Sequence, residues 1–62
     1  MIDIRKMTVL IVDDSMNMCQ SIRGMMKVIG FGKRFLYGHT GKEALELLAG
    51  EPVDLMLLDY NM

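Results

Sequence analysis

The chain has 62 residues, about half the usual length of one compact domain, which excludes two domains or an array of three or more repeats. Hydrophobic residues make up 52% of the sequence and charged residues 24%, a balance that argues against intrinsic disorder. The net charge of -1 gives no field that would gather nucleic acid or anionic lipid, so we expect neither as a partner.

Two further features bear on the compartment of the protein. The longest apolar run, residues 7–12, is too short for a membrane span or for the core of a signal peptide, and Asp13 and Asp14 end it. The single cysteine, Cys19, cannot form an internal disulfide, which is typical of a reducing compartment. We therefore expect a cytoplasmic protein without a membrane segment.

The first half of the chain predicts a strand followed by a helix. Residues Met7–Val12 are apolar at nearly every position and rich in β-branched side chains, which is typical of a strand buried on both faces. Ser15 is a suitable N-cap for a helix, and Gly30 and Gly32 are suitable residues to end it. The apolar stripe of this helix is predicted to comprise Met18, Ile22, Met25, Met26 and Ile29.

The second half repeats this alternation and adds a third strand. Arg34–Tyr37 is predicted to be a short strand, and Thr40 with Glu43 matches a capping box that opens a helix ending at Gly50. Val53–Leu58 is the third strand, and its last four residues are apolar on both faces. The chain therefore alternates strand and helix from beginning to end.

This alternation, with its tight connections, predicts an α/β fold with a parallel sheet and right-handed crossovers. If the two helices cover opposite faces, the spatial order of the strands is 2-1-3, which is the first half of a doubly wound sheet. In such sheets the functional crevice lies beyond the carboxyl ends of the strands, where the winding reverses. Here that point falls between the first and third strands.

Three carboxylates follow these two strands: Asp13 and Asp14 after the first, and Asp59 after the third. Like charges at short range require a proton or a cation, and oxygen ligands of this kind suit Mg²⁺. Taken singly, each residue has a structural explanation, because Asp13 and Asp14 can cap the next helix and Asp59 can form a turn. Their convergence at one switch point favours a functional site.

Four landmarks of the sequence share the spacing of a known family. Val9–Ser15 joins an apolar strand to an acidic pair, and Pro52–Met62 joins another strand to an aspartate. Between them lie Gly30-Phe31 and Gly41–Leu45, at a helix end and a helix start. Over nearly its whole length the chain thus resembles the receiver domains of two-component response regulators. In its first helix the chain is most similar to the short single-domain members of that family that act in chemotaxis.

The resemblance implies a role for each carboxylate. Asp59 matches the phosphoacceptor, which takes a phosphoryl group from a histidine kinase as an acyl phosphate. Asp13 and Asp14 match the Mg²⁺-binding pair, with Asp14 as the more direct ligand, and the backbone carbonyl of Asn61 matches a further ligand. The implied fold is flavodoxin-like, and residues 1–62 are expected to form the N-terminal half of one truncated receiver domain.

Several features of the family have no counterpart in the chain. These are its fourth and fifth strands, the Ser/Thr that reports phosphorylation, and the Lys that contacts the phosphoryl group. Without a fourth strand the outer edge of the third strand lacks a partner. An apolar edge such as Leu55–Leu58 is a template for pairing with another chain, so we expect self-association there.

Two functions from different classes remain open. One is a phosphoacceptor module that undergoes Mg²⁺-dependent phosphorylation on Asp59 without being a turnover enzyme. The other is a non-catalytic fragment that self-associates or binds a partner. A haloacid dehalogenase type of phosphatase is disfavoured because that class has Asp-x-Asp, whereas Asp13 is followed here by Asp14 and Ser15. A dinucleotide or flavin binder is disfavoured because no glycine-rich turn follows the first strand.

Three other kinds of side chain are expected to have a structural role and no functional one. Met18, Met25 and Met26 are predicted to fill the core, since thioethers adapt to irregular gaps. Cys19 is predicted to be a small buried hydrophobe, and His39 an exposed loop residue.

Overall fold

The computed structural model describes residues 2–58, so Met1 and residues 59–62 are outside the described part. The elements in chain order are the 3-10 helix η1 (Ile4–Lys6), β1 (Thr8–Val12), α1 (Met16–Val28), β2 (Arg34–Gly38), α2 (Gly41–Gly50) and β3 (Leu55–Leu58). The predicted alternation of strands and helices is confirmed, with bounds that differ by at most two residues. Only η1 was not predicted.

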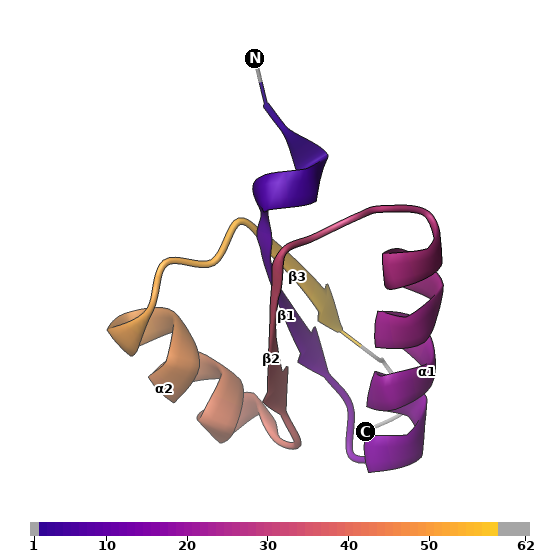
Figure 1. Cartoon of the computed structure of the whole chain (residues 1–62). Coiled ribbons are helices and arrows are strands. Elements are labelled where there is room, and N and C mark those ends of the chain that lie inside the picture. The colour runs from indigo at the N-terminus through magenta and orange to yellow at the C-terminus, as the bar shows by residue number, and fades with distance from the viewer. Residues whose placement is uncertain (1, 59–62) are drawn as a thin grey trace.

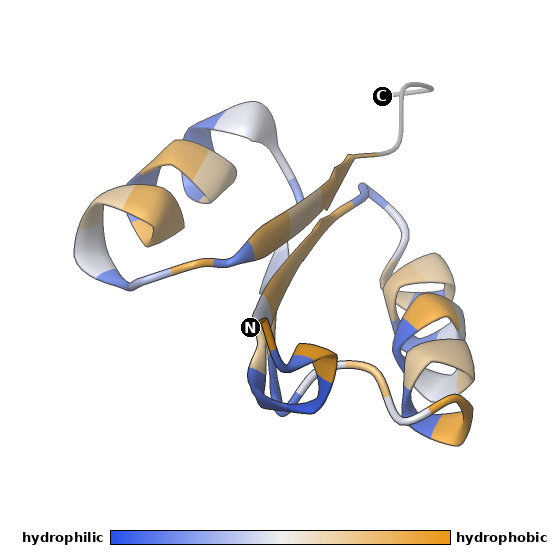
Figure 2. Ribbon diagram, turned by 90° about the horizontal axis from the view of Figure 1, so that it is seen from above, coloured by the Kyte–Doolittle hydropathy of each residue, from blue (hydrophilic) through white to orange (hydrophobic). Residues whose placement is uncertain are grey.

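The three strands form one parallel sheet in the order β2-β1-β3 (Figure 1). The helices α1 and α2 lie on opposite sides of this sheet (Figure 2). Val12, the last residue of β1, pairs with both Gly38 of β2 and Leu58 of β3, so all three strands end at one edge. The structure therefore confirms the predicted α/β fold and the 2-1-3 order of a flavodoxin-like half-sheet.

The core consists of two layers, one on each face of β1. All four residues from Val9 to Val12 are 0% exposed, which confirms a strand buried on both faces. The layer beneath α1 contains Val9, Ile11 and Cys19. The layer beneath α2 contains Leu10, Val12 and Ala44.

The sheet-facing stripe of α1 differs from the predicted one. Its members lie at intervals of three and four residues, Cys19, Ile22 and Met26, and all belong to the layer beneath α1. Met18 and Met25 are exposed, so the prediction that they fill the core is wrong, whereas burial of Cys19 is confirmed. Met18 and Met25 each precede a member of this stripe by one residue, so the roughly 100° step of the helix places them outside it.

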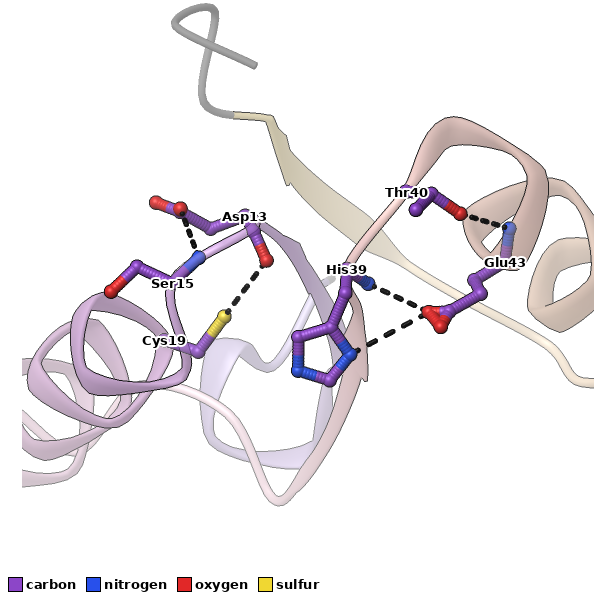
Figure 3. Close-up of polar contacts among 6 residues, drawn as sticks. All are labelled: Asp13, Ser15, Cys19, His39, Thr40 and Glu43. Carbon is purple, nitrogen blue, oxygen red and sulfur yellow. Dashed lines mark hydrogen bonds and ion pairs between the residues drawn. The ribbon is translucent and has the colours of Figure 1, made fainter.

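Both helices begin at the predicted caps. Ser15 Oγ accepts the backbone N–H of Met18 at 3.3 Å, and Thr40 Oγ1 accepts the backbone N–H of Glu43 at 3.1 Å. Glu43 Oε2 in turn accepts the backbone N–H of His39 at 3.0 Å, one residue before the cap (Figure 3). These bonds satisfy N–H groups that a helix start leaves without intrahelical partners.

The connection from α1 to β2 depends on glycine at two positions. Gly30 and Gly32 have φ values of 76° and 85°, a region that side chains with a Cβ rarely adopt. At Gly32 a Cβ would also lie 2.8 Å from Cζ of Phe35, whereas nothing lies within 4 Å at Gly30. The predicted helix stop is thus confirmed, and Gly32 additionally lets the loop pass close to β2.

Candidate functional site

The candidate site lies at the carboxyl edge of the sheet, where the three strand ends meet. Val12 of β1 pairs with Leu58 of β3. Asp13 follows Val12 in the chain, and Asp59 follows Leu58. The structure describes Asp13 and Asp14 at this edge. Asp59 and Asn61, the other two predicted site residues, are outside the described residues.

Asp13 is the most buried charged residue in the described part of the chain, with 1% of its surface exposed. Its backbone N–H continues the ladder to β2 by donating to the carbonyl of Gly38 at 3.0 Å. Its side-chain Oδ1 accepts the backbone N–H of Ser15 at 2.9 Å (Figure 3). The carboxylate is therefore fixed by the start of α1 on one side and by the sheet on the other.

The second carboxylate oxygen of Asp13, Oδ2, is buried and has no hydrogen-bond partner among residues 2–58. A buried carboxylate oxygen without a donor or a cation is costly, so each such atom requires an explanation. The bond from the N–H of Ser15 shows that one carboxylate oxygen of Asp13 caps the start of α1. This structural role does not account for the other oxygen. An oxygen in this state is suited to a hard cation.

Asp14, directly after Asp13, is exposed. The acidic pair therefore combines one buried and one solvent-accessible carboxylate. The unpaired buried oxygen belongs to Asp13. That Asp14 is the more direct ligand stays a prediction, because its exposed carboxylate is also accessible to a cation.

Cys19 lies directly beneath this site. Its Sγ is 3.8 Å from the backbone carbonyl oxygen of Asp13, the geometry of a weak S–H donor (Figure 3). Burial raises the pKa of the Cys19 thiol, and the negative charge of Asp13 raises it further. The thiol is therefore neutral at physiological pH and serves as packing under the acidic pair.

His39 follows the last residue of β2 and lies at the same edge. Its Nδ1 is 3.5 Å from Oε2 of Glu43, the oxygen that also accepts the backbone N–H of His39 (Figure 3). The predicted loop position of His39 is confirmed, and its side chain is 37% exposed and faces Glu43. This contact belongs to the capping box, whose Glu43 was identified from the sequence.

Within residues 2–58, no three His, Cys, Asp or Glu side chains lie close enough together to hold a metal ion. Asp13 and Asp14 alone supply two carboxylates. Asp59 and Asn61, the other two predicted ligands, are outside the described residues.

Comparison with known proteins gives one informative similarity. The chain is 42% identical over 60 residues to a protein of Vibrio cholerae serotype O1 named "Probable cyclic di-GMP phosphodiesterase". The aligned segment covers 97% of this chain but 13% of that protein. No family model matches the chain, and no solved structure matches it.

Among residues 2–58, neither α1 nor α2 combines the length and the apolar character that crossing a bilayer requires.

Proposed function

We propose that the chain is the phosphoacceptor part of a receiver module in a two-component phosphorelay. In this proposal Asp59 accepts a phosphoryl group from a histidine kinase in a Mg²⁺-dependent step. The observation that carries the proposal is the buried Oδ2 of Asp13 at the carboxyl edge of β1, which has no hydrogen-bond partner in the described part of the chain. The resemblance of the strand ends to receiver domains supplies the assignment of Asp59.

The donor set at this edge fits Mg²⁺. Asp13 and Asp14 provide carboxylate oxygens, and the cation would satisfy the buried Oδ2 of Asp13, which no donor among residues 2–58 reaches. Asp59 and the backbone carbonyl of Asn61 would complete the protein ligands. When bound, Mg²⁺ supplies neutralisation of the charge on the transferring phosphoryl group.

The residues of the chain have separate tasks in the transfer. A carboxylate oxygen of Asp59 attacks the phosphorus atom of the phosphohistidine, an O–P bond forms, and the P–N bond breaks. The electron pair of that bond returns to the imidazole of the kinase. The N–H of Ser15 holds one oxygen of Asp13 in place, so the other oxygen is oriented without further ordering. The product is an acyl phosphate on Asp59, formed once per chain without turnover.

The similarity to the Vibrio cholerae protein supports a regulatory position for such a module. A segment that covers 13% of a probable cyclic di-GMP phosphodiesterase leaves most of that protein for other tasks. We propose that the segment receives a phosphoryl signal and that this signal controls an activity located elsewhere in a longer protein. A cytoplasmic location belongs to this proposal, because the histidine kinase must reach Asp59.

The proposal is tested by measuring intact mass after incubation with Mg²⁺ and acetyl phosphate. We expect the unmodified chain and the control Glu46→Gln, which removes an exposed carboxylate on α2, to gain one phosphoryl group. Asp59→Asn should gain none, and chelation of Mg²⁺ by EDTA should suppress labelling of the unmodified chain.

Two results would contradict the proposal. Labelling that persists in Asp59→Asn would show that another residue is the acceptor. No labelling, beside a complete receiver domain that does label, would favour the non-catalytic interaction fragment.

A further inference from the structure

The polar groups of Asp13 are held from three directions. Its N–H donates to the carbonyl of Gly38 at 3.0 Å, and its Oδ1 accepts the N–H of Ser15 at 2.9 Å. Its backbone carbonyl oxygen lies 3.8 Å from Sγ of Cys19 (Figure 3). Oδ2 has no partner among residues 2–58, although the residue is 1% exposed. The surroundings of Asp13 therefore fix its position and leave one buried oxygen for a ligand.

Cys19 makes two of the contacts in the turn between β1 and α1. Asp13 follows the last residue of β1, and Cys19 lies in the first turn of α1, so the thiol joins the two ends of this turn. The N–H of Cys19 donates to the carbonyl of Ser15 at 3.1 Å, in the middle of the same turn. Ser15 in turn holds Oδ1 of Asp13. Both contacts of Cys19 thus act on the segment that places the carboxylate of Asp13.

The burial of this pair makes the thiol difficult to replace. Cys19 is 0% exposed and Asp13 is 1% exposed, so water has little access to the carbonyl oxygen between them. Among residues 2–58 no backbone N–H donates to this oxygen, and the thiol is the donor that reaches it. A buried carbonyl that loses its donor is costly. We therefore expect the turn to shift when the thiol is removed.

The alternative role of Cys19 is packing alone. The side chain belongs to the layer of Val9 and Ile11, and a buried cysteine often acts as a small hydrophobe. Its S–H group is a weak donor. Packing accounts for the burial of the side chain, but it does not require Sγ to face the carbonyl oxygen of Asp13. Substitutions that keep the volume and change the donor separate the two roles.

We propose that Cys19 is a positioning residue for the cation site, whose S–H bond to the carbonyl of Asp13 holds Oδ2 in the orientation that Mg²⁺ requires. This inference rests on the proposed function, in which Asp13 is a ligand. A ligand that is already oriented loses less freedom when the cation binds. Outer partners that bond directly to a ligand group typically change metal affinity by about tenfold or more. The thiol is a weak donor and acts through the backbone, so we expect a smaller effect of about threefold.

The first experiment needs no metal. The chain has one cysteine, so the S–H stretching band in its infrared spectrum belongs to Cys19. In EDTA we expect this band at a lower wavenumber than that of an alkanethiol in an apolar solvent, because the S–H group donates a bond. A band at the wavenumber of the alkanethiol would overturn the proposal.

The second experiment is a Mg²⁺ titration of the full 62-residue chain, followed by the backbone amide resonances of Asp13 and Ser15. Cys19→Ala removes the donor from the turn and should raise the Kd for Mg²⁺ about threefold. Cys19→Ser supplies a hydroxyl donor and should keep the Kd of the unmodified chain. Ile22→Val is the matched control, because it removes one buried methylene group from the layer beneath α1 and no hydrogen-bond donor. It should lower stability and leave the Kd unchanged.

Three results of the titration would overturn the proposal. They are an unchanged Kd in Cys19→Ala, an equal rise in Cys19→Ser, and an equal rise in Ile22→Val, since packing alone would then explain the effect of Cys19. Far-UV circular dichroism identifies a variant that fails to fold, and the infrared band of the unmodified chain then decides. If the unmodified chain binds no Mg²⁺, the cation site of the proposed function fails together with this inference. A failure confined to the Cys19 variants leaves that site intact.

Discussion

The strands β1 and β3 have similar sequences but different environments. Val9–Val12 and Leu55–Leu58 are both uninterrupted apolar runs, yet every side chain of the first is 0% exposed. In the second, Met56 and Leu58 are 43% and 52% exposed. The difference arises because β1 lies between two strands and beneath two helices, whereas no described element covers Met56 and Leu58. An apolar run therefore predicts a strand but does not predict how many of its faces are covered.

The comparison is tested most strongly by truncating one residue on the same face of each strand. Leu10→Ala leaves a cavity beneath α2 and should lower the free energy of unfolding by about 3 kcal/mol. Met56→Ala removes a partly exposed side chain and should cost about 1 kcal/mol or less. Urea denaturation at one fixed protein concentration measures both, and equal losses would show that β3 is covered as completely as β1.

The second test adds atoms around β1 instead of removing them. Gly32→Ala places a Cβ 3.1 Å from Cγ2 of Val9 and 2.8 Å from Cζ of Phe35, at a φ of 85°. We expect a loss of about 2 kcal/mol. Gly30→Ala has a similar φ but open space around the new atom, so it should cost about 1 kcal/mol. If thermal unfolding shows the same loss of stability for Gly32→Ala and Gly30→Ala, the contact of the new Cβ with Val9 of β1 contributes nothing to that loss.

The third test concerns the end of β1, where the packed strand meets the acidic site. Asp13→Asn removes a buried charge while keeping an acceptor for the N–H of Ser15. In EDTA, where no divalent cation compensates the charge, we expect the unfolding free energy to rise by about 1 kcal/mol. A lower stability of Asp13→Asn under the same conditions would mean that the carboxylate is already satisfied.

The smallest expected effect comes from Cys19 beneath β1. Its folded pKa is raised above the usual 9.0 because burial disfavours the thiolate and Asp13 repels it. The folded state therefore holds the thiol proton more tightly than the unfolded state does. The stability from this proton is present below pH 9.0 and is lost as the pH rises above it. Denaturation on both sides of this pH measures the slope, and Cys19→Ala should remove its contribution. An unchanged slope in that variant would assign the alkaline loss to other groups.

Local signals in the sequence predicted the framework of the fold. Ser15 and Thr40 are short polar side chains that satisfy helix N–H groups, and Gly30 adopts a φ that ends α1, so each acts through its immediate neighbours. The 2-1-3 order follows from two crossovers of fixed hand with helices on opposite faces. These features depend on few residues and were therefore predictable.

Features that depend on how elements pack together were not predictable. The sheet-facing side of α1 was assigned from the spacing of Met18, Ile22, Met25, Met26 and Ile29, but the side that packs on β1 contains Cys19, Ile22 and Met26. The helix η1 is only three residues long, and its local signal is the single N-cap Asp3, whose Oδ1 accepts the N–H of Arg5 at 3.0 Å. It is also held by the N–H of Gly32, which donates to the carbonyl of Ile4 at 2.7 Å, and no local pattern encodes that contact.

The candidate site was predicted in position but not in detail. Asp13 and Asp14 were assigned from their place after β1, and both lie at the carboxyl edge in the structure. The unpaired oxygen of Asp13 depends on the turn into α1, which gives one donor to a carboxylate that has two oxygens. Asp59 and Asn61 stay predictions, because both are outside the described residues.

The measurement that tests the account most directly is a Mg²⁺ titration of the chain followed by the backbone amide resonances in NMR spectra. If Oδ2 of Asp13 is a cation ligand, saturable shifts should concentrate at Asp13, Ser15 and the neighbouring end of β2. Asp13→Asn should abolish them, whereas Glu46→Gln should not. Shifts that are absent, or that persist unchanged in Asp13→Asn, would contradict a cation site at this edge.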